Sequence, residues 1–448
     1  MALRVAKPPS YLEILGRGAQ DPVRLLRAGS EHAPAGYPPW DKVRHLKPPD
    51  GLTAEEWWAG IKLARGGALR DLPLRDIAGR PFTYALPDAV LRLLHTIDQR
   101  CSGEVAMDEV VTTDGQAMQR YLVNSLMEEA IRSSQLEGAV TSRQVAKELL
   151  RSGREPRDRS ERMILNNYRA LTFMRERADE PLTPRLVLEL QRILTEGTLD
   201  EPDTAGRLQR PDEERVVVMN RDDGRVLHVP PPPEELPKRL RAMCAFANAP
   251  DDVGRFIHPV VRAILLHFWL GYDHPFVDGN GRTARALFYW YMRRRRYWLV
   301  EYLSISRILR DAPSKYNRSY LYSETDDNDT TYFLLYQLEV VERAIREFYD
   351  YLRHKTEQIR AVEQMVAGAR DLNHRQLALL GDALRHPDAR YTIGEHALTH
   401  RVTHETARAD LAVLAERKLL HRTQVGKPHR FTVPRDLERR LRALAAAG

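Results

Sequence analysis

The segment from His274 to Arg285 places an imidazole, a carboxylate, two glycines and two arginines within twelve positions. It reads His-Pro-Phe-Val-Asp-Gly-Asn-Gly-Arg-Thr-Ala-Arg and joins two stretches that both have helical periodicity. Glycines on both sides of Asn280 let successive backbone N–H groups converge on an anion, and the next helix adds its positive dipole end. An ordinary helix cap and turn is the alternative for a Gly-Asn-Gly sequence on its own. With its neighbours, the segment predicts a phosphate cradle.

The side chains around this cradle supply the groups that phosphoryl or nucleotidyl transfer requires. Arg282 and Arg285 are three positions apart on one helix face, where both can bind phosphate oxygens. Asp278 is a hard oxygen ligand, suited to a Mg²⁺ ion that bridges two phosphates. Histidine ordinarily titrates near neutral pH, so His274 fits a general base for a hydroxyl nucleophile.

This segment resembles the HxFx(D/E)GNGRxxR signature of the Fic (filamentation induced by cAMP) family of protein AMP-transferases. The resemblance implies an all-α core with a β-hairpin flap, and transfer of AMP from ATP to a protein Tyr, Thr or Ser hydroxyl, with this chain itself among the candidate targets. By position it implies that His274 is the base, Asp278 the Mg²⁺ ligand and Phe276 the residue that anchors the loop. The nucleotide-binding residues that it implies are Gly279, Asn280, Gly281, Arg282, Arg285, Tyr316 and Asn317.

A second segment, Ser133-Ser134-Gln135-Leu136-Glu137-Gly138, resembles the inhibitory-helix pattern [S/T]xxxE[G/N] of the same family, with Ser133, Glu137 and Gly138 at the fixed positions. A carboxylate paired with Arg285 would occupy the arginine that orients the γ-phosphate. The alternative is an ordinary residue at a helix end beside a glycine cap. We expect an inhibitory helix over residues 121–138. The inhibitory residue then belongs to the same chain as the active site, and no separate inhibitor protein is needed.

The remaining pattern predicts a mainly α protein in three parts. Residues 1–110 read as an extension of short helices and linkers that packs on the core, and residues 111–365 as the Fic domain. Thr183 before Pro184 predicts the start of a helix. Residues 215–229 predict a β-hairpin, either a flap that positions the target by β-augmentation or a plain structural hairpin.

Residues 371–448 predict a winged helix-turn-helix domain, with helices over 373–385, 392–399 and 403–417 and a hairpin around residues 426–428. This tail has 14 Lys and Arg against 9 Asp and Glu, which favours nucleic acid as a partner, although winged helices also bind proteins. The candidate DNA-contacting residues are Thr403, His404, Thr406, Arg408 and Lys427. The alternative function is therefore an ATP-sensing transcription regulator with a Fic-like sensor core.

The composition limits the other possibilities. With 448 residues, 43% of them hydrophobic and 29% charged, the chain is that of a folded protein. Its two cysteines, Cys101 and Cys244, exclude a disulfide framework. The longest apolar stretch is too short to span a bilayer and no secretory signal is visible, so we expect a cytoplasmic protein without a membrane partner. A homodimer is left open. His267, on an apolar helix, is expected to be a core histidine.

Overall fold

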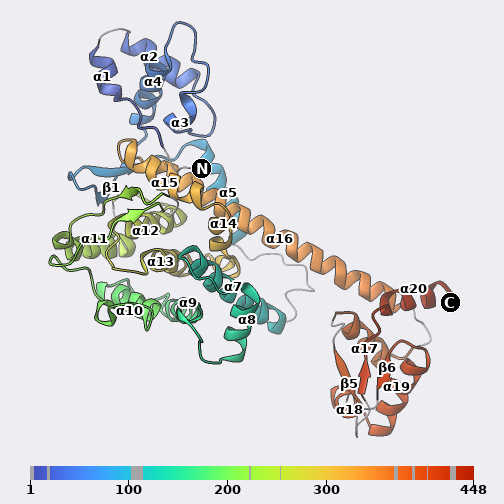
Figure 1. The fold of residues 1–448 in the computed structure, drawn as a ribbon. Coiled ribbons are helices and arrows are strands. Elements are labelled where there is room, and N and C mark those ends of the chain that lie inside the picture. The colour runs from blue at the N-terminus through green and yellow to red at the C-terminus, as the bar shows by residue number, and fades with distance from the viewer. Residues whose placement is uncertain are drawn as a thin grey trace. The chain divides into compact units, whose positions relative to one another are not determined.

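The structure is a computed structural model that describes residues 5–17, 21–101, 115–220, 223–252, 254–367, 372–385, 389–400, 402–423 and 430–447. The chain divides into two compact units, residues 1–348 and 349–448, and is mainly helical, as predicted (Figure 1). The long helix α16 (Thr331–Ala367) includes the boundary between them. None of the described helices combines the length and apolar character needed to cross a membrane.

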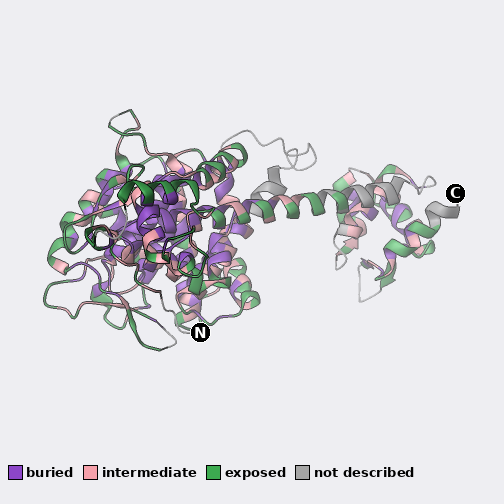
Figure 2. Ribbon diagram, turned by 90° about the horizontal axis from the view of Figure 1, so that it is seen from above, coloured by how far each residue is buried: buried purple, intermediate pink, exposed green. Residues whose placement is uncertain are grey.

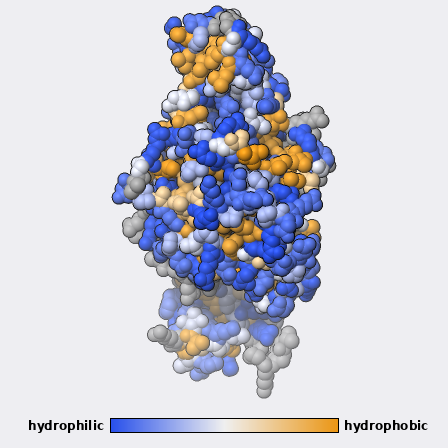
Figure 3. All heavy atoms as spheres, turned by 90° about the vertical axis from the view of Figure 1, so that its left-hand side faces the viewer, coloured by the Kyte–Doolittle hydropathy of each residue, from blue (hydrophilic) through white to orange (hydrophobic). Residues whose placement is uncertain are grey.

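The N-terminal part of the first unit has more regular structure than the sequence indicates. Its elements are α1 (Tyr11–Gly16), α2 (Pro22–Glu31), α3 (Trp40–Val43), α4 (Ala54–Gly66), β1 (Arg70–Arg75), β2 (Pro81–Tyr84) and α5 (Asp88–Cys101). At the contact between α2 and α4, a Cβ on Gly29 would lie 2.1 Å from the Gly60 carbonyl carbon. Leu12 of α1 and Val23 of α2 are exposed apolar side chains. Apolar side chains also gather on the surface of this part of the molecule, at the top of the view in Figure 3.

The antiparallel β1–β2 hairpin is absent from the sequence-based prediction. Pro73 lies inside β1, and a proline in such a stretch argues against a strand because it cannot donate to the ladder. The backbone of Thr83 in β2 donates to the Asn328 carbonyl at 2.9 Å and accepts from the Thr330 N–H at 2.8 Å. These bonds tie the N-terminal part to the beginning of α16.

The helices of the core surround α12 and α13. They are α7 (Gly115–Leu136), α8 (Arg143–Ser152), α9 (Arg159–Glu176), α10 (Pro184–Thr195), α11 (Leu236–Asn248), α12 (Pro259–Asp273), α13 (Asn280–Arg294), α14 (Ile305–Asp311) and α15 (Pro313–Thr325). Short 3₁₀ turns cover Pro202–Thr204, Pro233–Glu235 and Trp298–Tyr302. Every residue from Val260 to Leu270 of α12 is buried, because this helix is apolar on nearly all sides (Figure 2).

One predicted helix start in the core is confirmed by a capping bond, and another differs from the structure. The Thr183 hydroxyl accepts from the Leu186 N–H at 3.2 Å, which confirms the predicted start of α10. Helix α7 begins six residues before the predicted position 121 and ends at Leu136. Gly138 follows with φ of +106°, a conformation that glycine adopts without strain.

The predicted hairpin consists of two short antiparallel strands, β3 (Val218–Met219) and β4 (Val226–His228). The strands are shorter than the residue pattern indicates because the chain before Val218 bonds elsewhere. The Val216 N–H donates to the Gln209 side chain at 3.3 Å rather than to β4.

The second unit combines helices with a small antiparallel sheet. After the end of α16 come α17 (His374–Arg385), β5 (Arg390–Thr392), α18 (Ile393–His400), α19 (His404–Glu416), β6 (His421–Thr423), β7 (Arg430–Thr432) and α20 (Leu437–Ala447). The strand order is β5-β7-β6, around a core that contains Leu380, Leu411 and Phe431. The helices and hairpin have the predicted order, and β5 and α20 are additional elements.

Candidate active site

The loop between α12 and α13 is held in one shape by its own atoms. His274 ends α12 in the left-handed conformation, with φ of +43°, and its N–H donates to the Leu270 carbonyl at 3.0 Å. Phe276 is fully buried. The Asn280 side chain accepts from the Phe276 N–H at 3.0 Å and donates to its carbonyl at 2.8 Å. Since both ends of this amide are used within the loop, the backbone N–H is what Asn280 offers to a ligand.

The half-buried His274 ring is arranged to accept a proton. Its Nδ1 lies 3.4 Å from the Gly271 carbonyl, which favours the tautomer with the proton on Nδ1 and a lone pair on Nε2. Burial lowers the pKa of His274 to about 4; the bond to Gly271 opposes this shift, and the charges of His228 and Arg215 add to it. The imidazole is therefore neutral near pH 7, as a general base must be.

The amino end of α13 forms a cradle that Glu137 covers. Gly279 precedes this helix with φ of +86° and, as a glycine, has no side chain with which to cap the first turn. A Cβ on Gly281 would lie 2.2 Å from Oε1 of Glu137 and 3.0 Å from Nη1 of Arg285. Only glycine leaves room for this approach. The carboxylate consequently lies where a phosphate would meet the positive end of the helix.

Arg285 is bound to the end of α7. Its Nε donates to the Ser133 hydroxyl at 2.8 Å, and its Nη2 donates to the Ser133 carbonyl at 3.1 Å and to Oε1 of Glu137 at 2.8 Å. Only 1% of the Arg285 side chain is exposed, against 26% for Glu137. Within the described part of the chain, Nη1 of Arg285 is buried without a hydrogen-bond partner. A buried donor of this kind beside the cradle fits a phosphate oxygen.

Asp278 and Arg282 form an ion pair at the base of the loop. Nη2 of Arg282 donates to Oδ2 of Asp278 at 3.1 Å, and Nη1 donates to the Leu194 carbonyl of α10 at 2.9 Å. Oδ1 of Asp278 accepts from the Gly279 N–H at 2.6 Å. The Asp278 side chain is 37% exposed, so its remaining lone pairs can reach a cation. Among the described residues no cluster of three ionisable ligands occurs, so a Mg²⁺ here would share Asp278 with phosphates and water, its usual mode of binding.

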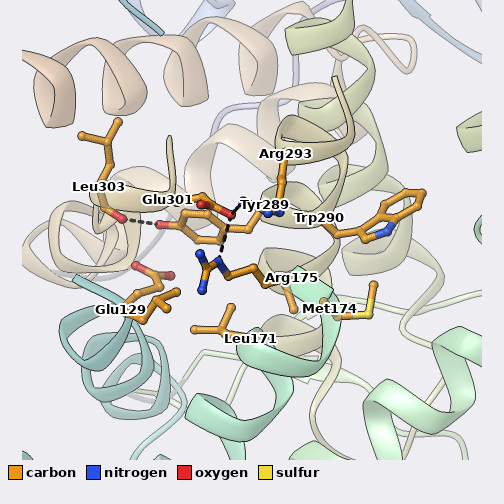
Figure 4. Close-up of a pocket in the computed structure, with 11 residues that line it drawn as sticks. Glu129, Leu171, Met174, Arg175, Tyr289, Trp290, Arg293, Glu301 and Leu303 are labelled. Atoms are coloured by element: carbon orange, nitrogen blue, oxygen red, sulfur yellow. Dashed lines mark hydrogen bonds and ion pairs between the residues drawn. The ribbon is translucent and has the colours of Figure 1, made fainter. Parts of the chain in front are cut away.

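A small cavity, about 20 Å³ in volume, lies between α7, α9 and α13, and Glu129 of α7 lies at its edge (Figure 4). The buried Glu129 carboxylate accepts from the Ser304 hydroxyl at 2.9 Å and from both the N–H, at 3.1 Å, and the hydroxyl of Ser306. Burial raises the pKa of Glu129. Glu129 lies two turns before the end of α7, and Glu137 is the first residue after that helix. Glu129 thus fixes the helix at whose end Glu137 lies.

The main cavity, about 440 Å³ in volume, is bounded by the end of α7, the β3–β4 hairpin, the end of α12 and helices α14 and α15. Residues singled out in the sequence that line it are Glu137, His274, Gly281, Tyr316 and Asn317. Phe276, Asn280 and Arg282 are buried behind this lining. The Tyr316 hydroxyl lies 2.8 Å from Nε2 of His267, which confirms His267 as a buried, hydrogen-bonded core histidine.

Two residues that support the loop have no sequence signal. The Arg215 guanidinium donates to the carbonyls of His274, at 3.0 Å, and Asp273, at 2.7 Å. Burial lowers the pKa of Arg215 to about 10. Gln191, buried in α10, donates to the Asp278 carbonyl at 3.0 Å. Both contacts join positions that are distant in the sequence, so no local pattern could indicate them.

In the second unit, the residues proposed for DNA lie at the beginning of α19. The Thr403 hydroxyl caps the helix by accepting from the Thr406 N–H at 3.2 Å, and it also bonds to the Thr406 hydroxyl at 2.9 Å. His404 and Arg408 are exposed. Lys427 lies outside the described residues. The beginning of α19 therefore presents one imidazole and one guanidinium to solvent.

Comparison with known proteins identifies the region around this loop. Residues 181–292 match the model of the Fic/DOC family. A 60-residue segment is 48% identical to "Protein adenylyltransferase Fic" of Nematostella vectensis and spans 13% of this chain and 14% of that protein. The protein of the same name from Drosophila melanogaster is 42% identical over 60 residues, 13% of this chain and 12% of that protein.

One similarity to a solved structure extends over most of the chain. A Fic family protein from Desulfovibrio desulfuricans G20 matches with a TM-score of 0.52 and 19% identity, covering 79% of this chain and 98% of that chain. At this identity, the similarity concerns the fold alone.

Proposed function

Because the chain is a Fic family protein, we propose that it is a protein adenylyltransferase that moves AMP from ATP to a Tyr, Thr or Ser hydroxyl of a protein. The observation that carries this proposal is the main cavity, where a neutral His274 and the amino end of α13 face the same space. The cavity volume of about 440 Å³ lies within the range of small-molecule sites. Tyr316 and Asn317 line it at the place proposed for the adenine base.

In the proposed reaction, Nε2 of His274 takes the proton from the target hydroxyl as its oxygen attacks the α-phosphorus of ATP. The bond from this phosphorus to the bridging oxygen breaks, and pyrophosphate leaves while AMP stays on the target. The backbone N–H groups at the beginning of α13 hold phosphate oxygens, and Arg285 holds the γ-phosphate. Mg²⁺ held by Asp278 would neutralise charge on the phosphates.

We further propose that Glu137 inhibits this reaction from within the chain. Its carboxylate bonds to Arg285 at 2.8 Å and lies against Gly281, so it occupies two places that the phosphates of ATP require. Displacement of Glu137 would free both places together. The bonds of Ser133 to Arg285 do not depend on the Glu137 side chain, so the guanidinium would keep its orientation.

The test uses the full chain with α-labelled ATP and Mg²⁺, comparing wild type, Glu137→Gly and the double variant Glu137→Gly/His274→Ala. We expect label on the chain itself or on lysate proteins with Glu137→Gly alone. Glu155→Gly, which removes an exposed carboxylate from the connection between α8 and α9, is the matched control and should behave as wild type. An unlabelled Glu137→Gly sample would contradict inhibition by Glu137. Label in the double variant would contradict the role of His274.

The second candidate function is that of an ATP-sensing, DNA-binding transcription regulator; the element order of the second unit and the exposed His404 and Arg408 favour its DNA-binding part. Gel shifts of the full chain on genomic fragments at two salt concentrations test it. Binding should weaken as salt rises and on Arg408→Ala, since phosphate contacts release counterions. Shifts that neither salt nor this substitution changes would count against the proposal. A homodimer and a cytoplasmic location stay predictions, checked by light scattering and cell fractionation.

A further inference from the structure

The histidine of the β3–β4 hairpin, His228, is buried at the wall of the main cavity and has no part in the reaction described above. Its Nε2 lies 2.7 Å from the Tyr272 carbonyl of α12, and its Nδ1 lies 2.7 Å from Oε2 of Glu324 of α15. The ring also packs against the Tyr272 ring, with 4.7 Å between centroids. One side chain therefore joins the hairpin to both helices.

The partners of His228 determine the protons that the ring must carry. The Tyr272 carbonyl only accepts hydrogen bonds, and the ionised Glu324 carboxylate does likewise. Both bonds form together only when each ring nitrogen donates, as in the imidazolium. The pair with Glu324 is then a charge-assisted bond, stronger than a neutral one.

The location of this contact connects it to catalysis. Tyr272 lies two residues before His274, in the last turn of α12. On the other side, Val218, Met219 and Leu227 of the hairpin line the same cavity as His274. A shift of the hairpin would change the wall beside the proposed base, without touching Arg285 or Gly281.

We propose that His228 is a positioning residue, which as an imidazolium latches the β3–β4 hairpin, and any target segment held on it, to the turn that carries His274. Only the expected effect on target labelling rests on the proposed adenylyltransferase function. The latch itself is a property of the fold.

The surrounding charges leave Glu324 as the partner of His228. Among the described residues, other charged or titratable groups near the latch are Tyr320 of α15, Tyr272 and Asp273 of α12, Arg239 of α11, Arg215 before β3, His274 and Asp76. Asp76 accepts from Nε of Arg80 at 2.8 Å and from Nδ2 of Asn328 at 3.0 Å, so its Oδ2 is taken. Asp273 accepts from Nε of Arg239 at 2.7 Å and from the Trp269 indole at 2.9 Å, so both its oxygens are taken. The Arg215 guanidinium donates to backbone carbonyls. Glu324 is thus the carboxylate that holds the ring.

Hydrogen exchange of the full chain measures the latch directly. We expect the amides of residues 218–228 to exchange about ten- to a hundredfold faster in His228→Ala, the effect of losing one charge-assisted bond. Glu324→Gln keeps an amide oxygen that can accept from Nδ1, so it should retain more of this protection than His228→Ala, whereas Glu324→Ala should lose it to a similar degree.

Controls separate the latch from general destabilisation and from the proposed function. His95→Ala removes an exposed histidine of α5 and should leave the hairpin unchanged. In the Glu137→Gly background, His228→Ala should raise the concentration of target needed for labelling and leave ATP affinity unchanged. Unaltered exchange of residues 218–228 in His228→Ala, or equal acceleration throughout the first unit, would overturn the proposal. If Glu137→Gly shows no labelling at all, the proposed function fails while the exchange result still decides the latch.

Discussion

Replacing Glu137 should tighten the binding of ATP by an amount that its contact with Arg285 sets. The carboxylate and the guanidinium are 2.8 Å apart, and Arg285 is 1% exposed, so the nucleotide must break a charge-assisted bond in a poorly solvated place. Such a bond contributes about 1.5 to 3 kcal/mol. Its removal in Glu137→Gly should lower the Kd for ATP by about 10- to 150-fold. Glu137→Gln keeps an acceptor without the charge, and we expect a gain of about half that free energy.

The same substitution should lower stability in the absence of nucleotide. Breaking a buried ion pair from one side leaves an uncompensated charge and costs about 3 to 5 kcal/mol. Glu137 is partly exposed and Ser133 keeps two bonds to Arg285, so we expect the lower end of this range or less. Binding of ATP should restore most of the decrease in Tm, because its γ-phosphate supplies Arg285 with the negative charge that Glu137 no longer provides.

Isothermal titration calorimetry of wild type, Glu137→Gln and Glu137→Gly with ATP and with AMP measures the effect. AMP lacks the phosphate assigned to Arg285, so its affinity should change much less than that of ATP. Equal gains for both nucleotides would show that Glu137 acts by obstruction of the cradle alone. No gain for either would refute competition between the carboxylate and phosphate.

Four further perturbations test other parts of the structure. Arg215→Met removes donors from the carbonyls at the end of α12, and labelling rates in the Glu137→Gly background should fall by about 10- to 100-fold while ATP affinity, by calorimetry, stays constant. Because burial lowers the pKa of His274 to about 4, labelling should be flat from about pH 6 to 8 and should decline only as acid protonates the ring near pH 4, read from a pH–rate profile. Asp410 of α19 is buried and accepts from Nε of Arg375 and from Nδ2 of Asn373, both at 2.7 Å. Asp410→Asn should therefore destabilise the second unit by about 3 kcal/mol in calorimetric melts. Burial alone would raise the pKa of Asp410, but the hydrogen bonds and the charge of Arg375 outweigh it and lower this pKa to about 2, so the stabilisation is present above about pH 4 and is lost as pH falls towards 2. Gly29→Ala should destabilise the first unit by about 3 kcal/mol or more in denaturant titrations, because the new methyl group meets the backbone of α4.

The sequence predicts those parts of the site that are close together in the chain. Residues 274 to 285 form the loop and the first turns of α13, so their local pattern is enough to indicate the cradle. The pairing of Glu137 with Arg285 was predicted through the resemblance to a family pattern. Periodicity alone offers no such link between residues 148 positions apart.

Other parts of the structure cannot be predicted from the local pattern of a single sequence. The β1–β2 hairpin contains Pro73, and its neighbours at the beginning of α16 are more than 200 residues away. Arg215 and His228 look like ordinary strand residues, yet their side chains bond to the end of α12. Tertiary packing determines such contacts, and it can override the conformational preference of the local sequence.

Two arginines beside the loop, the half-buried Arg215 and the buried Arg285, have different roles, one in supporting the loop and the other in responding to ligands. Arg215 donates to backbone carbonyls, which no ligand can replace without unfolding the end of α12. Arg285 is bound partly by Ser133 and partly by Glu137, a side chain that is 26% exposed and that a phosphate can displace towards solvent. A phosphate can therefore take the place of Glu137 and leave the Ser133 bonds intact. In this arrangement Arg215 fixes the geometry of His274 in every state, and Arg285 responds to whichever anion occupies the cradle.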